Sequence, residues 1–445
     1  MHVVIVGNGV AGSTAARYIR KQSDHQVTMI SHETDHFYSR TALMYVFMGH
    51  MRYQDIKPYE DWFWDKNRIE LMRATVSSID TGQKQVHFEG GRPSLAYDKL
   101  ILATGSRPRH VNWPGEDSKG VQHLITWQDL EVMEKNAPKA RHAVVVGGGL
   151  IGIEMAEMLH SRGIGVTLLV RESGYFRNVL LDEESAMLDR HIREHGIDLR
   201  LESELTSIQA NDNGKVQSVK TKDGETIKCQ FVGITIGVLP NIELATPQTG
   251  IETDRGFLVN DYLQTNQPDV YALGDCAQVR APQPGRGAIE PVWYTGKMMG
   301  EVAAANVCGE ATPYRPGVWF NSAKFFDIEW HTYGATPAKI PESMDSLYWA
   351  HPSRHKAIRL IYDRESLALT GVNTLNTRYR HEVCDAWIGQ GTPINEVLPH
   401  LRKANFDPEF FKAYEKELLR LWNERFPAKA VKQPKRQAIA ALFGL

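Results

Sequence analysis

The chain has 445 residues, which is too long for a single compact core, so roughly two to four domains are expected. Its 51 lysines and arginines nearly balance 53 aspartates and glutamates, and this excludes an overall charge that would indicate a nucleic acid or an acidic partner. No stretch approaches the roughly 20 apolar residues of a membrane span, and a core strand begins close to Met1. We therefore expect neither a signal peptide nor a transmembrane helix, and a cytoplasmic location.

The first predicted elements are an apolar strand over 3–6, a glycine turn, a helix over 13–21 and a second strand over 26–30. The turn has the pattern Gly-x-Gly-x-x-Gly. In such a turn the first glycine permits a tight bend, the second lets the backbone approach a pyrophosphate, and the third lets the helix pack on its strand. Phosphates then lie at the positive end of the helix dipole. The three glycines are Gly7, Gly9 and Gly12.

A strand-rich stretch over 69–88 follows, and a strand over 100–103 runs into Thr104 and Gly105. The chain is expected to leave the first domain here.

The strand, glycine turn and helix then recur, with strands over 142–146 and 166–170 and a helix over 154–162. One copy of the glycine pattern is weak support for a binding site, because many loops match it by chance. Two copies, each after an apolar strand, predict two bound dinucleotides. The second set of glycines is Gly147, Gly149 and Gly152.

A helix over 183–194 and strands over 199–205 and 216–220 complete the second unit. The segment 237–241 is interpreted as the return crossing to the first domain, which ends with a strand over 270–273 and a helix over 294–306. The first domain is therefore expected to be discontinuous in sequence.

Beyond Pro316 the pattern predicts aromatic-rich strands to about residue 372 and then helices. Asp407 is the expected N-cap of the last helix, with Pro408 at its first position. Residues 427–445 form a tail that is first basic and then apolar. The tail could dock to an acidic electron carrier or to an anionic membrane. The alternative is a tail that is solvated or packs in an oligomer. The last helix carries an apolar stripe, interpreted as packing, of Phe410, Phe411, Tyr414, Leu418, Leu421 and Trp422.

Four cysteines lie far apart, without a Cys-x-x-Cys pair. We interpret them as buried apolar residues rather than as metal ligands or disulfide partners, and no metal site is expected. The cysteines are Cys229, Cys276, Cys308 and Cys384.

Four motifs in this order resemble those of the FAD-dependent pyridine nucleotide-disulfide oxidoreductases, flavoproteins that bind two dinucleotides. They are the two glycine turns, the Ala103-Thr104-Gly105 segment and the run from Tyr271 to Asp275. The resemblance covers roughly residues 1–380.

The resemblance implies an α/β fold with two Rossmann-like domains, the second inserted in the first, and a C-terminal α+β domain. The implied FAD domain comprises 1–110 and 237–316, the NAD(P)H domain 111–236 and the C-terminal domain 317–426.

The resemblance also implies site residues. Glu154 lies close to the nicotinamide ring, although an acid opening a helix also has the simpler explanation of favourable placement in the dipole. Trp293 lies beside the flavin, where ordinary core packing is the alternative. Glu33 is the nearest carboxylate to the adenine ribose, and Arg40 lies near the FAD or forms a surface ion pair. The cofactor-binding residues are Gly7, Gly9, Ala11, Gly12, Glu33, Arg40, Ala103, Thr104, Gly105, Gly274, Asp275, Gly147, Gly149, Leu150, Ile151, Gly152, Arg171, Arg177 and Gly237.

The chain departs from the disulfide reductases of this family, which need a thiol against the flavin. Where their active cysteine is expected, this chain has the segment from Thr41 to Phe47. The segment from Tyr38 to Leu43 therefore resembles the ferredoxin and rubredoxin reductase branch, which passes electrons outward singly. A lysine that approaches the flavin in those relatives corresponds to Tyr45, so the tuning of the flavin stays open.

The choice of nicotinamide also stays open. Val170 stands where NAD-selective sites usually have an acid, and two arginines, Arg171 and Arg177, suit a 2′-phosphate. Glu172 beside Arg171 favours the opposite choice.

We therefore predict an FAD-dependent enzyme that passes electrons from NADPH or NADH to rubredoxin, ferredoxin or a small acceptor. The alternatives are a disulfide or coenzyme A disulfide reductase or NADH oxidase, and a flavin-bound interaction module that responds to NAD(P)H. A homodimer is possible, and no nucleic acid is expected.

Overall fold

The computed structural model describes residues 1–407 and 414–432. They form two compact units: unit 1 comprises 1–173 and 196–316, and unit 2 comprises 174–195 with the chain from 317 onward. Both predicted dinucleotide-binding regions fall in unit 1, except that the segment 174–195 belongs to unit 2. The α/β fold predicted from the sequence is confirmed, because unit 1 is built on two parallel sheets.

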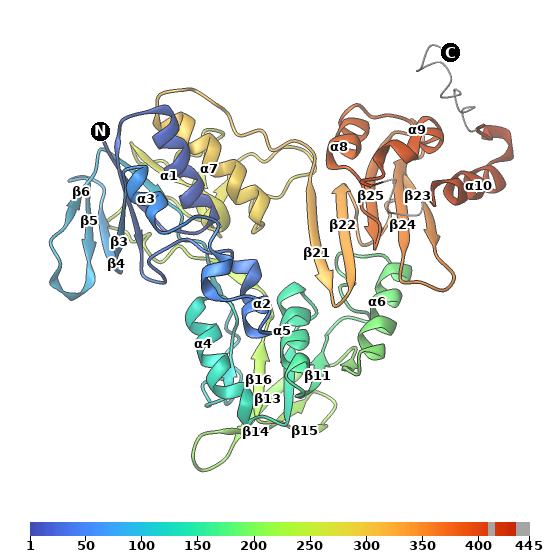
Figure 1. The fold of residues 1–445 in the computed structure, drawn as a ribbon, viewed down its shortest axis with the longest axis horizontal. Helices are drawn as coiled ribbons and strands as arrows, with labels where there is room; N and C mark the ends of the chain where they lie inside the picture. The colour runs from blue at the N-terminus through green and yellow to red at the C-terminus, as the bar shows by residue number, and fades with distance from the viewer. Residues whose placement is uncertain (408–413, 433–445) are drawn as a thin grey trace. The chain divides into compact units, whose positions relative to one another are not determined.

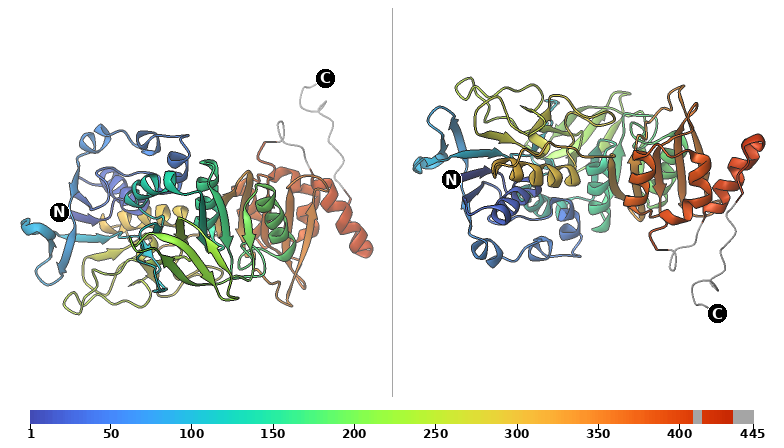
Figure 2. Two further views of the ribbon diagram at one scale, coloured as in Figure 1. Left: turned by 90° about the horizontal axis from the view of Figure 1, so that it is seen from below. Right: turned by 90° about the horizontal axis from the view of Figure 1, so that it is seen from above.

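The first sheet of unit 1 has the strand order β19-β7-β1-β2-β3, and all its pairs are parallel. Its central strands are continuous runs of valine, isoleucine and leucine because both faces of a parallel sheet are covered. Helices α1 and α7 lie side by side on it (Figures 1 and 2). The elements are β1 (His2–Val6), α1 (Val10–Gln22), β2 (Gln26–Ser31), β3 (Ile69–Arg73), β7 (Lys99–Leu102), β19 (Val270–Ala272) and α7 (Trp293–Val307).

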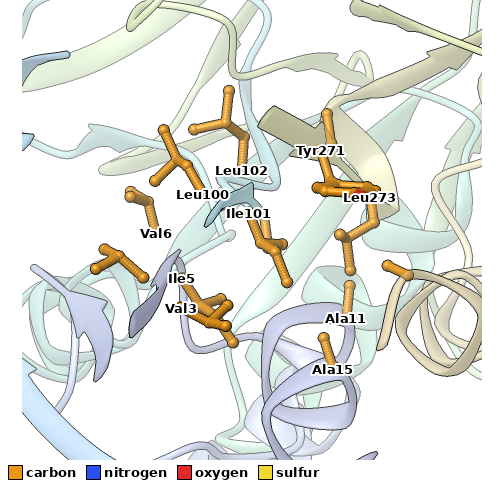
Figure 3. Close-up of a cluster of buried hydrophobic side chains, with 14 of the residues drawn as sticks. Val3, Ile5, Val6, Ala11, Ala15, Leu100, Ile101, Leu102, Tyr271 and Leu273 are labelled. Carbon is orange, nitrogen blue, oxygen red and sulfur yellow. The ribbon is translucent and has the colours of Figure 1, made fainter. Parts of the chain in front are cut away.

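The core of this domain lies between the sheet and helix α1. Figure 3 shows Ala11 and Ala15 of the helix among the side chains of the strands. The side chains of Val3, Ile5, Leu100 and Ile101 have no exposed surface. Small residues on α1 let the helix approach the sheet closely, so the glycine turn that joins strand and helix is held by packing on both sides.

The second sheet of unit 1 has the order β12-β11-β10-β16-β9 and is also parallel. Helix α5 is packed against β10 and β11. The elements are β9 (Val121–Gln122), α4 (Trp127–Asn136), β10 (His142–Val146), α5 (Leu150–Ser161), β11 (Gly165–Leu169), β12 (Asp198–Arg200) and β16 (Phe231–Ile234).

Smaller elements complete unit 1. The short helices are α2 (Leu43–Phe47) and α3 (Trp62–Lys66). Two three-stranded antiparallel sheets consist of β4 (Val76–Asp80), β5 (Gln85–Phe88) and β6 (Leu95–Ala96), and of β13 (Leu205–Ala210), β14 (Val216–Thr221) and β15 (Thr226–Lys228). Two strand pairs join β8 (Ser106–Pro108) with β17 (Val238–Pro240) and β18 (Phe257–Val259) with β20 (Ala277–Val279).

Unit 2 is an antiparallel five-stranded sheet with helices, in the strand order β21-β22-β25-β24-β23. Helix α6 (Asp182–Glu194) comes from the inserted segment 174–195, and Arg359 on the sheet pairs with its Glu184, with Nε and Oε2 3.1 Å apart. The other elements are β21 (Phe320–Phe325), β22 (Ile328–Gly334), β23 (Met344–Ala350), β24 (Ala357–Asp363), β25 (Leu369–Leu375), α8 (His381–Gly389), α9 (Ile394–His400) and α10 (Glu415–Arg425).

Several predicted boundaries were wrong. The helices after the glycine turns begin at Val10 and Leu150, because each turn leads directly into its helix. The predicted strand over 199–205 is two strands, β12 and β13, in different sheets.

Part of the predicted last helix lies outside the described residues. Leu418 and Trp422 of its predicted stripe are fully buried, which confirms their packing role. Pro408, Phe410 and Phe411 lie outside the described residues, as does most of the tail. Among the described residues, no helix has the length and apolar character to span a bilayer.

Candidate functional site

The first glycine turn lies where the strand order of the first sheet reverses. The chain passes from β1 to β2 on one side, whereas β7 lies on the other side of β1. Gly7 has φ of 115°, and a Cβ there would lie 2.0 Å from the carbonyl oxygen of Ala103, directly after β7. Only glycine fits this position. In open α/β sheets such a reversal is where ligands bind.

The other two glycines of this turn have different reasons to be glycine. A Cβ at Gly12 would lie 2.1 Å from the carbonyl oxygen of Gly7, so Gly12 allows α1 to pack on the turn. Gly9 has an ordinary φ of −68°, and a Cβ there would meet no protein atom within 4 Å. Nothing in the protein itself requires glycine at position 9. Open space beside backbone at a helix N-terminus fits the approach of a pyrophosphate.

The second glycine turn repeats this arrangement in the second sheet. It lies between β10 and β16, again where the strand order reverses. Gly147 has φ of 130°, and its Cβ would lie 2.4 Å from the carbonyl oxygen of Thr235. A Cβ at Gly152 would lie 2.3 Å from the carbonyl oxygen of Gly147, whereas a Cβ at Gly149 would again meet nothing within 4 Å. The two turns, which we call the first and second cradles, therefore have equivalent geometry, and each is a candidate dinucleotide site.

Helices α1 and α5 also suit phosphate at their N-termini. Neither has an acidic residue in its first turn, and the N-cap residue of each is a glycine, Gly9 or Gly149, which has no side chain to cap the helix. The positive end of each dipole is therefore not neutralised by a carboxylate. Leu150 and Ile151 are the first two residues of α5, and Ala11 is the second residue of α1.

The other predicted FAD residues include Gly274, which lies beside the first turn, and residues of the loop after β7 and of the segment that leads into β17. A Cβ at Gly274, which has φ of 74°, would lie 3.0 Å from Cβ of Ala11. The Thr104 hydroxyl donates to the carbonyl oxygen of Asn241 at 2.6 Å, and the Asn241 amide donates to the carbonyl oxygen of Gly105 at 2.9 Å. Gly237, with φ of 102°, precedes the strand β17 that leads to Asn241.

Asp275 is held in place beside this loop. The Ser106 hydroxyl donates a hydrogen bond of 2.5 Å to Oδ2 of Asp275. Burial raises the pKa of Asp275, while the Ser106 hydrogen bond and the positive charge of Arg40 oppose this rise. The carboxyl group is therefore directed by a hydroxyl donor and lies in the field of a guanidinium.

The buried Glu33 and the half-buried Arg40 form an ion pair. Nη1 and Nη2 of Arg40 donate to Oε1 and Oε2 of Glu33 at 2.9 and 2.7 Å, and the Trp127 amide donates to Oε1 at 2.9 Å. The Tyr38 hydroxyl donates to the same carboxylate. Although burial alone would raise the pKa of Glu33, the hydrogen bonds from Arg40 hold it below its ordinary value. The structure thus shows Glu33 orienting Arg40, while a ribose contact by Glu33 stays a prediction.

Glu154 lies in the second turn of α5, not at its start as predicted. Burial raises the pKa of Glu154 to about 7, and the neighbouring charge of Glu157 adds to the rise. The dipole explanation for this acid therefore fails, because the helix dipole acts mainly within the first turn. A carboxyl group with a pKa near 7 exchanges a proton at physiological pH.

The predicted 2′-phosphate residues are not equivalent in the structure. The Arg171 side chain is 75% exposed, and its Nη2 lies 3.0 Å from Oε1 of Glu172. A Cβ on Gly148 of the second glycine turn would lie 2.9 Å from Cγ1 of Val170 and 3.6 Å from Oε2 of Glu172. Val170 and Glu172 thus border the second glycine turn. Arg177 belongs to unit 2, where its Nη1 donates to the carbonyl oxygens of Leu180 and Ala338, both at 3.1 Å.

Trp293 begins α7 and stacks on Phe37, with ring centroids 5.8 Å apart. Tyr45, for which a role in tuning the flavin was left open, lies in α2.

None of the four cysteines is activated. Burial raises the pKa of Cys229 and of Cys384 to about 12, and it also raises the pKa of Cys276 and Cys308. The thiol of Cys276 points to the carbonyl oxygens of Leu273 and Leu102, at 3.3 and 3.5 Å. A reactive cysteine needs a lowered thiol pKa, and these have the opposite shift.

Sequence reasoning missed several residues that shape the site. Ser106 directs Asp275, and its place directly after the Ala-Thr-Gly motif could have indicated this. Gly296 and Gly300 of α7 allow contact with α1, since a Cβ at Gly300 would lie 2.6 Å from the carbonyl oxygen of Ala11. Their spacing of four on a helix was the available signal.

Comparisons with known proteins agree with this geometry. The family model described as pyridine nucleotide-disulphide oxidoreductase matches residues 1–299. The chain is 34% identical over 311 residues to the assimilatory nitrate reductase electron transfer subunit of Bacillus subtilis. The matched region covers 69% of this chain and 39% of that protein. The chain thus spans about two fifths of that relative's length.

A second relative is matched over most of its length. Rhodocoxin reductase of Rhodococcus erythropolis is 30% identical over 356 residues, covering 78% of this chain and 82% of that one. Among solved structures, a ferredoxin reductase from Rhodopseudomonas palustris has a TM-score of 0.77 and 25% identity, covering 84% of this chain and 91% of that one.

Proposed function

The chain belongs to the pyridine nucleotide-disulphide oxidoreductase family, and on that premise we propose that it passes electrons from NAD(P)H through FAD to a separate acceptor. The acceptor class that we favour is a small iron-sulfur carrier such as a rubredoxin or ferredoxin, because relatives named for such carriers match the chain over most of their length.

The observation that carries this proposal is the state of the cysteines. A disulfide reductase needs a thiolate beside the flavin. In this chain burial raises the pKa of every cysteine thiol, and the segment after Arg40 contains no cysteine. Electrons therefore leave the cofactor without a protein thiol, which favours transfer to an external carrier over reduction of a disulfide.

The first cradle would hold FAD. The backbone at Gly9 and the N-terminus of α1 would bind the pyrophosphate, Asp275 would bind polar groups of the cofactor, and Trp293 would border the ring. When bound, FAD supplies the ability to accept a hydride and release electrons one at a time. The chain's own contribution is binding, orientation and exclusion of water, with little acid-base chemistry required.

The second cradle, at Gly149 and α5, would bind NAD(P)H. We place Glu154 near the nicotinamide, where its neutral form at pH below about 7 would avoid a charge beside the ring. Arg171 is exposed and Val170 replaces the usual acid, so we favour NADPH. Glu172, which borders Gly148 and pairs with Arg171, is the residue that would allow NADH.

We also propose that the protein is located in the cytoplasm. All four cysteines are free, which suits a reducing compartment such as the cytoplasm. We further propose that the chain forms a homodimer.

The test combines three measurements on the FAD-loaded chain. Reduction by NADPH or NADH is followed anaerobically at the flavin absorbance, and the reduced protein is then mixed with a rubredoxin or ferredoxin. Thiols are titrated before and after reduction. We expect carrier reduction and an unchanged thiol count. Two additional thiols would favour a disulfide reductase, and slow flavin reduction without turnover of any acceptor would favour an interaction module.

A further inference from the structure

Helix α6 of unit 2 and the loops that pack on it carry a cluster of histidines and carboxylates that the proposed redox function does not use. His191 lies on α6 and His195 directly after it, one helical turn apart. Asp327 lies between β21 and β22. We propose that Nε2 of His191, Nε2 of His195 and Oδ1 of Asp327 bind a divalent transition-metal cation, for which Zn²⁺ is the best chemical match.

The distances within this group suit a shared cation. The three ligand atoms all lie within 4.8 Å of one another. Nε2 of His195 lies 3.4 Å from Oδ1 of Asp327, and Nε2 of His191 lies 2.6 Å from the same oxygen. Ligands that are bound to zinc at about 2.0–2.2 Å in a tetrahedral site lie roughly 3.4 Å apart. A cation would therefore require His191 and Asp327 to separate by less than about 1 Å.

The state of His191 points to a missing ligand. Its side chain is 2% exposed. Among the described residues neither ring nitrogen makes a well-aligned hydrogen bond, although Asp327 is close. A buried polar atom without a partner destabilises a fold.

The tautomer of His195 favours the same conclusion. Nδ1 of His195 lies 2.9 Å from the carbonyl oxygen of His191. Because a carbonyl only accepts, Nδ1 carries a proton, and Nε2 of the neutral ring would present its lone pair toward Asp327. A cation placed between these two acceptors would be bound by both. A metal-binding histidine typically donates its other ring N–H to a carbonyl in this way.

A second group on the same helix is less suited. It consists of Nδ1 of His191, Oε2 of Glu194 and Nε2 of His355. Nε2 of His355 lies only 3.1 Å from Oε2 of Glu194, so these two residues pair with each other. Nδ1 of His191 lies 3.9 Å from that oxygen. We therefore assign the cation to the group that contains Asp327.

A bound ion would have a structural consequence within unit 2. Helix α6 lies in sequence between β11 and β12, whereas Asp327 comes from the later sheet (Figure 1). The ion would cross-link the segment 174–195 to the sheet, alongside the pair of Arg359 and Glu184. The sequence alone predicted no metal site because Asp327 is far from the two histidines along the chain.

The test uses the full chain loaded with FAD, produced without a histidine tag, treated with a chelator and dialysed. Zn²⁺ binding is measured by calorimetry and by metal analysis, and the melting temperature is measured with and without Zn²⁺. The ligand variants are His195→Ala and Asp327→Asn, both at exposed or half-exposed positions. The matched controls are His355→Ala for the second group on α6 and His110→Ala for a separate group with Glu116 and His123.

We expect tight binding to the original chain and to both controls, and at least about tenfold weaker binding to each ligand variant. Zn²⁺ should raise the melting temperature of the original chain and not that of the ligand variants. Flavin absorbance in all variants checks that they fold. The proposal is overturned if the original chain does not bind Zn²⁺, if the ligand variants bind it equally well, or if binding is lost with His355 or His110 instead.

Discussion

The hydroxyl of Ser106 donates a hydrogen bond of 2.5 Å to Oδ2 of Asp275, although the two residues are 169 positions apart. Ser106 begins β8, directly after the Ala-Thr-Gly loop, and Asp275 follows β19. This hydrogen bond therefore joins two of the four motifs that identify the cofactor site, and it keeps the Asp275 carboxylate in one orientation.

Replacement of Ser106 by alanine should weaken FAD binding by about tenfold, because a hydrogen bond to a charged group contributes about 1.5–3 kcal/mol. The measurement is fluorescence titration of the FAD-free chain with FAD. The exposed Ser94→Ala is the control. Equal FAD affinity in Ser106→Ala and the original chain would show that the orientation of Asp275 does not matter.

Gly7 and Gly9 of the first turn should respond differently to alanine. Gly7→Ala should destabilise the fold by about 3 kcal/mol or more, because its Cβ would lie 2.0 Å from a carbonyl oxygen at a φ of 115°. Gly9→Ala should leave the stability of the FAD-free chain within about 0.5 kcal/mol, since its Cβ meets nothing. It should nevertheless weaken FAD binding by about tenfold.

Denaturant unfolding and FAD titration separate these two effects. A Gly9→Ala chain that binds FAD normally would contradict the assignment of the open space beside Gly9 to the pyrophosphate.

Glu154→Gln should stabilise the protein in a pH-dependent way. The pKa of Glu154 rises from 4.5 to about 7 in the folded chain. Between these values the folded state keeps a proton that the unfolded state loses, so stability falls as pH rises from about 4.5 to 7 and is constant above. Glutamine removes this loss, which amounts to at most about 3 kcal/mol.

The check is the free energy of unfolding of both chains at pH 5 and pH 8. The gain from glutamine should be small at pH 5 and largest at pH 8. A gain that does not change with pH would mean that Glu154 titrates near its ordinary value in the fold.

Arg171→Ala should lower kcat/KM for NADPH by about tenfold or more and leave the value for NADH nearly unchanged. The reason is that a guanidinium pairs with the 2′-phosphate, which NADH lacks. Glu172→Gln should change the two values in the opposite sense, since it removes the carboxylate beside Gly148. Steady-state rates with both nucleotides decide this. Equal losses with NADPH and NADH would remove Arg171 from the phosphate site.

Much of this fold follows from local sequence patterns. The run from Val3 to Val6 and the run from Val144 to Val146 predict buried parallel strands, and the glycines after them predict both turns. These features depend on a few neighbouring residues, and the structure confirms them.

The remaining features depend on contacts between distant segments, which local pattern does not specify. The ribose contact expected of Glu33 stays a prediction, and the hydrogen bonds that its carboxylate accepts from Arg40, Tyr38 and the Trp127 amide were visible only in the structure. Arg177 follows β11 in sequence, yet it belongs to unit 2. The approach of Asp327 to His191 likewise required the tertiary structure.

The most direct test of the central claim is stopped-flow reduction of the FAD-loaded chain and of Gly149→Ala by NADPH and NADH under anaerobic conditions. A Cβ at position 149 meets no protein atom, so this variant should fold and retain FAD. We expect rapid loss of flavin absorbance in the original chain. In Gly149→Ala the nucleotide concentration that gives half the maximal rate of reduction should be about tenfold higher than in the original chain. A chain that cannot be loaded with FAD, or a flavin that neither nucleotide reduces, would contradict the account.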